Sequence, residues 1–290
     1  MFIHIQDKPH KKQVIFYKLK SIELLGDDYM LFKIGDLVTR DSYENDLVFK
    51  ITEINNNTAY LKGYDIRLYA DSDIKDLRLV NEKDLKIEDE EFIKAVDESN
   101  KLDRNEFFYL PGKVLHIDGD TEYLERCMKF YKKLKVMAYG VNLKEEVIAT
   151  EIKSYLDDLK PDIVVITGHD VYYKRLGTKE DIRSYKNSSN FVKAIKAARD
   201  YEKSHDKLII IAGACQSDYE ELIKAGANFA SSPKRINLHA LDPAIVSTSI
   251  ALSDRNKPID LVNIIDRTKY KEEGIGGIIT NGVMYVGYPR

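Results

Sequence analysis

Two short runs of apolar, mostly β-branched residues constrain the fold of this chain most strongly. They are IVVIT at residues 163–167 and LIIIA at residues 208–212. A strand that is apolar along its whole length is typical of a parallel sheet covered by helices on both faces. Helical patterns lie between and before these runs, so strands and helices alternate along the chain. We therefore expect an α/β fold with a mostly parallel sheet flanked by helices.

The helices and further strands of this unit are visible as periodic patterns. VLHI at 114–117 and VMAYGV at 136–141 are short apolar runs that predict two more strands. Two segments between the strands, 118–134 and 145–162, carry apolar residues at helical spacing, and Pro161 ends the second. Their apolar positions are Leu124, Cys127, Met128, Tyr131, Leu134, Val147, Ile148, Ile152, Tyr155, Leu156 and Leu159.

The amino-terminal part of the chain has a different character. Four β patterns separated by turn residues predict a small SH3-like β-barrel over residues 32–80. These patterns are FKIGDLVTR (32–40), DLVFKITEI (46–54), TAYLKGYDIRLYA (58–70) and DLRLV (76–80). We expect the aromatic and basic residues of the third pattern on the barrel surface, where they would recruit a substrate; they are Tyr60, Tyr64, Arg67 and Tyr69.

The remaining boundaries follow from composition. We expect residues 1–31 to be an amino-terminal extension, and Met30 is a candidate start of translation. The charged segment 81–106 predicts a solvated helix or linker, and the α/β domain occupies residues 107–290.

Charge and cysteine content exclude several classes of function. The formal net charge of −3 comes from interspersed acidic and basic residues, so we expect no nucleic-acid partner. No apolar run approaches the ~20 residues that span a bilayer, so we expect no membrane partner and a cytoplasmic protein. Two cysteines cannot form a disulfide framework in a chain of this size. We expect neither a metal nor a cofactor.

Two reactive side chains follow the two apolar strands. ITGHD places His169 after the first strand, and AGACQS places Cys215 after the second. Parallel strands end at the same edge of a sheet, where α/β proteins bind their ligands. Ser217 and Glu220 predict a capping box for the helix that follows, and a helix amino terminus lowers a thiol pKa. The pair predicts a nucleophilic cysteine with a histidine acid/base partner.

The alternative for each of these residues is a structural role. A lone cysteine after an apolar strand is more often a packing residue, and we assign that role to Cys127. His116 lies within a strand and is interpreted as structural, whereas His239 is a rival catalytic histidine that does not end a long apolar strand. The matched positions of His169 and Cys215, 215 − 169 = 46 residues apart, favour catalysis.

Longer motifs carry a family resemblance. A histidine at one strand end and Ala-Cys at a later one are similar to the caspase-type cysteine peptidases. IGDLVTR, PGKVLHIDGD, ITGHD, AGACQS, AGANFASSP and NLHALDP resemble the YabG sporulation peptidases over residues 30–290. The resemblance implies a caspase-like endopeptidase of spore-forming bacteria that cleaves after arginine. Its implied substrates are spore coat and other spore proteins, and its location is the cytoplasm of the sporulating cell, with the spore coat as a second site.

The resemblance also assigns roles to residues. Cys215 matches the family nucleophile and His169 the dyad histidine. In caspases a glycine follows the histidine and donates to the oxyanion, whereas here Gly168 precedes it and Asp170 follows, so both are oxyanion candidates. Four further residues are substrate-binding candidates: Asp118 and Asp120 as acidic partners of arginine, and Ser231 and Ser232 as contacts to the substrate backbone.

Two other classes of protein remain open at this point. A small-molecule cysteine hydrolase or amidotransferase carries G-x-C-x-G at its nucleophile, and here the second glycine is replaced by Ser217. A non-catalytic spore scaffold would use the SH3-like segment as its binding module.

Overall fold

The computed structural model describes residues 32–80, 85, 88–99 and 105–289. The proposed extension 1–31, with the alternative start at Met30, lies outside the described residues.

The amino-terminal part is a five-stranded antiparallel sheet with the strand order β4-β3-β2-β1-β5. Its strands are β1 (Leu37–Arg40), β2 (Phe49–Asn55), β3 (Thr58–Gly63), β4 (Tyr69–Asp73) and β5 (Leu77–Leu79). Alternate apolar side chains, including Val38, Phe49, Ile51 and Leu61, form a small separate core.

The prediction of one strand over residues 58–70 is wrong in its middle. The chain leaves β3 at Gly63, and residues 64–68 form a loop before β4 begins. The peptide turns back sharply here. The Gly63 N–H donates to the Leu68 carbonyl oxygen at 2.6 Å, and the Leu68 N–H donates to the Ile66 carbonyl oxygen at 2.8 Å. A Cβ at residue 63 would lie 2.1 Å from the Ile66 oxygen, so this close approach requires glycine.

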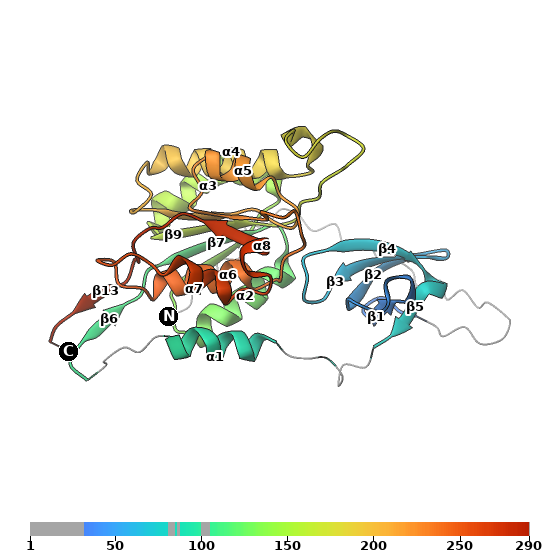
Figure 1. The fold of residues 1–290 in the computed structure, drawn as a ribbon, viewed down its shortest axis with the longest axis horizontal. Coiled ribbons are helices and arrows are strands. Elements are labelled where there is room, and N and C mark those ends of the chain that lie inside the picture. Colours follow the sequence, from blue (N-terminus) through green and yellow to red (C-terminus); the bar gives the residue numbers. More distant parts are fainter. Residues whose placement is uncertain (1–31, 81–84, 86–87, 100–104, 290) are drawn as a thin grey trace.

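The second part is a six-stranded sheet with helices on both faces (Figure 1). Its order is β12-β11-β10-β9-β7-β8, and every neighbouring pair is parallel except β11 with β12. The strands are β7 (Val114–Asp118), β8 (Ala138–Asn142), β9 (Ile163–Thr167), β10 (Ile209–Ala212), β11 (Phe229–Ser231) and β12 (Ile275–Gly277). The α/β prediction is confirmed.

Helices α3 (Glu145–Leu159), α4 (Ser188–Tyr201) and α5 (Tyr219–Lys224) cover one face of this sheet. The opposite face packs against α2 (Thr121–Lys133), α6 (Asp242–Ala251) and α7 (Leu261–Asp266). Alternate residues of β9 enter the two cores: Val164 and Ile166 pack on the α3 side, and Ile163 and Val165 on the α6 side. This double burial explains why the strand sequences are apolar throughout.

The other elements complete the structure around these two sheets. Helix α1 (Asp89–Ser99) lies in the charged segment 81–106, and α8 (Lys271–Gly274) precedes β12. Strands β6 (Phe108–Leu110) and β13 (Tyr285–Gly287) pair as a two-stranded ribbon.

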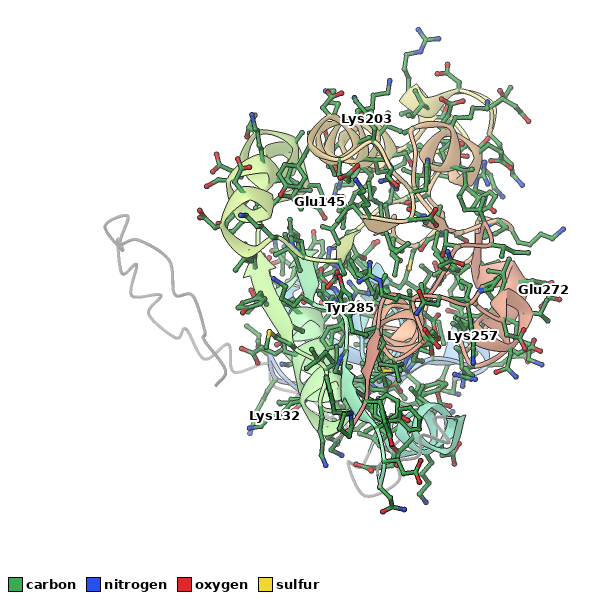
Figure 2. The ribbon with its side chains drawn as sticks, turned by 90° about the vertical axis from the view of Figure 1, so that its left-hand side faces the viewer. Lys132, Glu145, Lys203, Lys257, Glu272 and Tyr285 are labelled. Atoms are coloured by element: carbon green, nitrogen blue, oxygen red, sulfur yellow. The ribbon has the colours of Figure 1, made fainter. Side chains whose placement is uncertain are left out.

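Figure 2 shows charged side chains such as Lys203, Lys257 and Glu272 on the outer surface. No helix in the described residues is long and apolar enough to cross a membrane.

Helix α3 offers a matched test of the packing. Ile152 is fully buried between the helix and the sheet, whereas Val147 on the same helix is 42% exposed. We expect Ile152→Ala to lower the free energy of unfolding by about 2–5 kcal/mol because it leaves a cavity. Val147→Ala should change it by less than about 0.5 kcal/mol. Urea unfolding of both variants measures the difference, and equal losses would contradict the packing described.

Candidate active site

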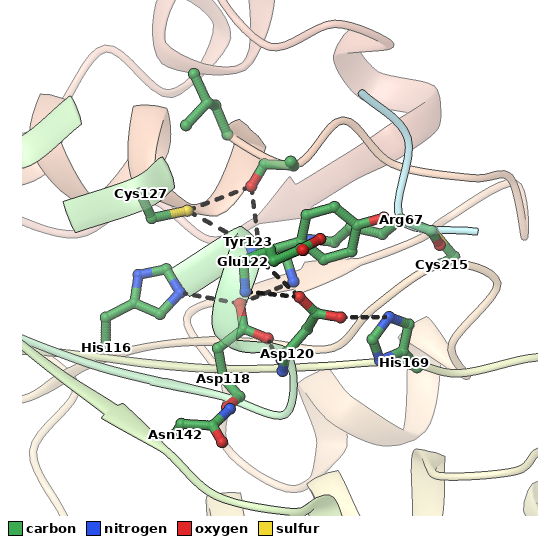
Figure 3. Close-up of polar contacts among 12 residues, drawn as sticks. Arg67, His116, Asp118, Asp120, Glu122, Tyr123, Cys127, Asn142, His169 and Cys215 are labelled. Carbon is green, nitrogen blue, oxygen red and sulfur yellow. Dashed lines mark hydrogen bonds and ion pairs between the residues drawn. The ribbon is translucent and has the colours of Figure 1, made fainter. Parts of the chain in front are cut away.

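His169 and Cys215 lie at the same edge of the large sheet, as the sequence predicts. Strands β9 and β10 are adjacent and parallel, with Ile166 opposite Ala212. His169 comes two residues after β9 ends and Cys215 three residues after β10 ends. Figure 3 shows both residues beside Asp120 and Arg67. Among the described residues, their side chains do not hydrogen-bond each other directly, and His169 Nε2 has no hydrogen-bond partner.

The Cys215 thiol is buried against main-chain groups from two other segments. Its Sγ donates to the carbonyl oxygen of Arg67 at 2.6 Å and accepts from the Leu238 N–H at 3.1 Å. Burial raises the pKa of this thiol to about 12, and the nearby N–H and Arg67 guanidinium only partly oppose that rise. In this buried position the thiol is therefore neutral at pH 7.

The His169 imidazole is enclosed by aromatic rings and carboxylates. The Tyr69 and Tyr123 rings lie 4.6 and 5.9 Å from it, centroid to centroid. Its Nε2 is 3.6 Å from Asp120 and its Nδ1 is 3.8 Å from Glu145. Burial lowers the His169 pKa to about 4, although Asp120 favours the charged form. The imidazole is neutral at pH 7 and can accept a proton.

Glu145, which is labelled in Figure 2 at the start of α3, orients the His169 loop. Its carboxylate accepts the His169 main-chain N–H at 2.7 Å. A Cβ at residue 119 or 168 would lie 2.5 or 2.3 Å from Glu145 Oε1, so the two glycines leave space for this carboxylate. No motif in the sequence marks Glu145, which simply opens a helix.

Arg67 brings the amino-terminal sheet into the site, although we expected it on a surface. The residue is only 1% exposed, and its Nη1 lies 2.8 Å from Asp118 Oδ2 (Figure 3). Its Nη2 donates to the Ala240 carbonyl at 3.1 Å, and the Tyr123 ring lies 4.8 Å from the guanidinium. Burial opposes ionisation of Asp118, but Arg67 overcomes this and holds the pKa of that carboxyl below its usual range. Asp118 is thus an arginine-binding carboxylate in this structure.

The main chain around Arg67 pairs with the segment that follows β11. The Arg67 N–H donates to the Leu238 carbonyl at 3.0 Å, and the Ala240 N–H donates to the Asp65 carbonyl at 2.9 Å. Ile66 and His239 lie opposite each other in an antiparallel bridge. Residues 65–67 therefore add a short strand beside residues 238–240, next to Cys215.

Asp170 connects the loops that carry His169 and Cys215 through its buried side chain. Its carboxylate accepts the Asn187 N–H at 2.7 Å and the Ser188 and Ser217 hydroxyls at 2.5 and 2.9 Å. The Ser217 hydroxyl oxygen in turn accepts the Ala214 N–H at 2.9 Å, one residue before Cys215. Asp170 is thus placed to position the His169 and Cys215 loops.

The other candidate residues have well-defined surroundings. Asp120 caps α2 by accepting the Glu122 and Tyr123 N–H groups, and it also pairs with Lys62 at 2.7 Å. Ser231 belongs to β11 and lies opposite Ile275. Ser232 closes a turn through hydrogen bonds between its hydroxyl and the Ile236 main chain, at 2.8 and 3.0 Å.

The structure gives the surroundings of several other residues that the sequence analysis interprets. The capping box at Ser217 is wrong: α5 begins at Tyr219, and the Asp218 side chain caps it by accepting the Glu221 N–H. Cys127 does lie on the buried face of α2, and its thiol donates to the Ala240 carbonyl at 3.3 Å. His116 lies inside β7 against the Tyr131 hydroxyl, at 2.9 Å. His239 is buried in the pairing segment with its ring 5.0 Å from Phe92.

No cluster of three or more histidine, cysteine or acidic side chains suited to a metal ion occurs among the residues that the structure describes.

The fold and the site define an α/β protein with a buried thiol and a neutral imidazole at the carboxyl edge of its sheet. The family model described as YabG peptidase U57 matches residues 33–289. The chain is 40% identical over 286 residues to the sporulation-specific protease YabG of Bacillus subtilis (strain 168), covering 90% of this chain and 99% of that protein. The chain belongs to the YabG peptidase family, which favours a peptidase over an amidotransferase or a scaffold.

The Asp170 network predicts a joint loss of stability and activity. Asparagine can accept fewer hydrogen bonds than the carboxylate, so Asp170→Asn should leave a buried hydroxyl unsatisfied. We expect the free energy of unfolding to fall by about 1–3 kcal/mol, with slower peptide cleavage under conditions where the variant is folded. The exposed Asp200→Asn is the control. Full activity in a folded Asp170→Asn protein would contradict the positioning role.

The low pKa of His169 predicts how stability depends on pH. Below its ordinary pKa of 6.5 the unfolded chain binds a proton at His169 that the folded protein does not bind until about pH 4. The His169 contribution to stability is thus present above pH 6.5 and is lost as pH falls toward 4. In urea unfolding between pH 7 and 4, the free energy of unfolding should fall less steeply with pH in His169→Gln than in the wild-type protein. The difference in slope is up to about 1.4 kcal/mol per pH unit. Equal slopes for the wild-type protein and His169→Gln would rule out the neutral buried imidazole.

Proposed function

We propose that this protein is a cysteine endopeptidase that cleaves after arginine through a dyad of Cys215 and His169. The observation that carries the proposal is the position of Arg67, whose guanidinium pairs with Asp118 while its carbonyl oxygen accepts from the Cys215 thiol at 2.6 Å. An arginine bound in this way has its peptide bond beside the candidate nucleophile. The peptidase family membership supports the same reading.

The proposed chemistry uses the two side chains in turn. When a substrate binds, His169 accepts the Cys215 proton and the thiolate attacks the carbonyl carbon of the arginine. The imidazolium then protonates the amide nitrogen as the C–N bond breaks, which leaves a thioester on Cys215. Water, deprotonated by His169, attacks the thioester and releases the product acid, and the thiol regains its proton. Main-chain N–H groups of Cys215, Gly168 and Asp170 are the proposed oxyanion donors.

Specificity is proposed to come mainly from Asp118. A carboxylate buried at the base of a site discriminates strongly, because a neutral substrate side chain would leave it without its charge-assisted hydrogen bonds. The Ala240 carbonyl and the Tyr123 ring complete the seat of the guanidinium. Asp120 borders this site through Tyr69 and Lys62. Ser231 and Ser232 are proposed as contacts to the substrate backbone.

The biological setting follows from the family. We propose that the protein acts in the cytoplasm of the sporulating cell, with the spore coat as a second location, on spore coat and other spore proteins. We assign residues 32–80 as an SH3-like barrel, 81–106 as a charged helix and linker, and 107–290 as a caspase-like peptidase domain, after an extension at 1–31. The mostly parallel sheet with both catalytic residues at its carboxyl edge supports the caspase-like assignment.

Substitution of the dyad tests the reaction. We expect Cys215→Ala and His169→Ala to reduce cleavage of an arginine-containing peptide by at least about 1,000-fold, because nucleophile and general acid/base contributions are both large. His205→Ala changes a histidine of the same domain outside the site and should cleave normally. The readout is the initial rate of product formation, measured by chromatography. Unreduced cleavage by either dyad variant would disprove the assignment.

Substitution of the arginine seat tests specificity separately. We expect Asp118→Asn to lower the preference for an arginine peptide over the matching citrulline peptide by roughly 10- to 100-fold, because citrulline has the same shape without the charge. The measured quantity is the ratio of the two kcat/KM values, which does not depend on the fraction of folded enzyme. An unchanged ratio would remove Asp118 from the specificity pocket.

A further inference from the structure

The substrate site is filled by a segment of the same chain. Residues 65–67, in the loop between β3 and β4, place Arg67 on Asp118 and their main chain on residues 238–240. The groups proposed to hold a substrate arginine are thereby engaged, namely the Asp118 carboxylate, the Ala240 carbonyl and the Tyr123 ring, and so is the proposed nucleophile, the Cys215 thiol. An arginine from another protein therefore requires this segment to leave first.

The segment is held in a geometry that does not favour cleavage. The Arg67 carbonyl presents its oxygen to the Cys215 sulfur as a hydrogen-bond acceptor, whereas attack requires the sulfur to approach the carbonyl carbon. The nitrogen of the next residue, which would leave as an amine, donates at 2.8 Å to the Ile66 carbonyl. The Tyr123 hydroxyl holds the same carbonyl at 3.1 Å and that of Gly63 at 2.7 Å. The turn around Arg67 is thus held by hydrogen bonds within itself and to Tyr123 of α2.

Ion pairs and a hydrogen bond hold this loop on the α/β domain. Before it, Lys62 pairs with Asp120 at 2.7 Å and with Glu122 at 2.9 Å. Within it, Asp65 pairs with Arg126 at 2.7 Å. After it, the Tyr69 hydroxyl donates to Asp120 at 3.2 Å. Residues of the amino-terminal sheet thus clamp the loop over Cys215 from both sides.

We infer that residues 65–67 are an internal pseudosubstrate that inhibits the peptidase until the amino-terminal sheet moves away. This inference rests on the proposed function, because it takes the Arg67 seat as the specificity pocket. Inhibition is competitive: bound segment and bound substrate use the same carboxylate and the same main-chain partners. The apparent affinity for a substrate is reduced by the fraction of molecules in which the segment is displaced.

Arg67→Ala provides the direct test. Removing the guanidinium takes away the ion pair with Asp118 and the hydrogen bond to the Ala240 carbonyl, so kcat/KM for an external arginine peptide should rise by roughly 10- to 100-fold. Arg78→Gln is the matched control, since Arg78 lies in the same sheet with its side chain 69% exposed and pairs with Asp41. An unchanged or lower kcat/KM in folded Arg67→Ala would overturn the inhibition.

A second variant covers the case in which Arg67→Ala does not fold. Asp65→Asn removes the carboxylate charge that pairs with Arg126 and leaves the Arg67 side chain and its partners unchanged, so kcat/KM should rise by about two- to fivefold. Intact mass of the wild-type chain is recorded at the end of each assay. An unbroken chain supports the inhibitory role of residues 65–67. A break between Arg67 and Leu68 would overturn that role, because the segment would then be bound as a substrate.

Failure of the proposed dyad and failure of the proposed pseudosubstrate give different results. If Cys215→Ala retains cleavage in the Arg67→Ala background, the dyad is wrong. If cleavage depends on Cys215 and His169 but neither Arg67→Ala nor Asp65→Asn is faster than wild type, the peptidase assignment stands and the pseudosubstrate is rejected.

Discussion

The buried ion pair between Arg67 and Asp118 is the interaction on which the site depends. It joins the amino-terminal sheet to the first strand of the large sheet, and both side chains are fully enclosed. Loss of one partner of such a pair costs about 3–5 kcal/mol, because the other charge stays buried and unpaired. Together with the ion pairs of Lys62 and Asp65 and the main-chain pairing, this pair holds the Arg67 main chain against Cys215 and residues 238–240.

The same burial determines the charge state of the candidate catalytic groups. Exclusion of water raises the Cys215 pKa to about 12 and lowers the His169 pKa to about 4, so both are neutral at pH 7. A neutral thiol is a weak nucleophile. The closed arrangement is therefore consistent with a resting enzyme. In the proposed mechanism, the proton passes from sulfur to imidazole when a substrate replaces residues 65–67.

Much of the large sheet was predictable because its strands are apolar on both faces and its helices carry a regular stripe. This pattern also placed His169 and Cys215 at one edge, since adjacent parallel strands end together. The Arg67 loop was not predictable: TAYLKGYDIRLYA alternates like one strand, and only the contact between Gly63 and Ile66 reveals the turn. The sequence indicates Asp170 only as an oxyanion candidate, because its side-chain hydrogen bonds reach residues 187, 188 and 217, which are distant in the sequence.

The most direct test of the central claim is covalent labelling with a peptidyl arginine chloromethyl ketone, followed by mapping of the adduct by mass spectrometry. The reagent needs both an acidic seat for its arginine and a nucleophile next to it. The account predicts one adduct, on the Cys215 sulfur, that forms faster in Arg67→Ala and is suppressed by Asp118→Asn. An adduct on Cys127, or labelling of Cys215 that is indifferent to Asp118, would contradict it.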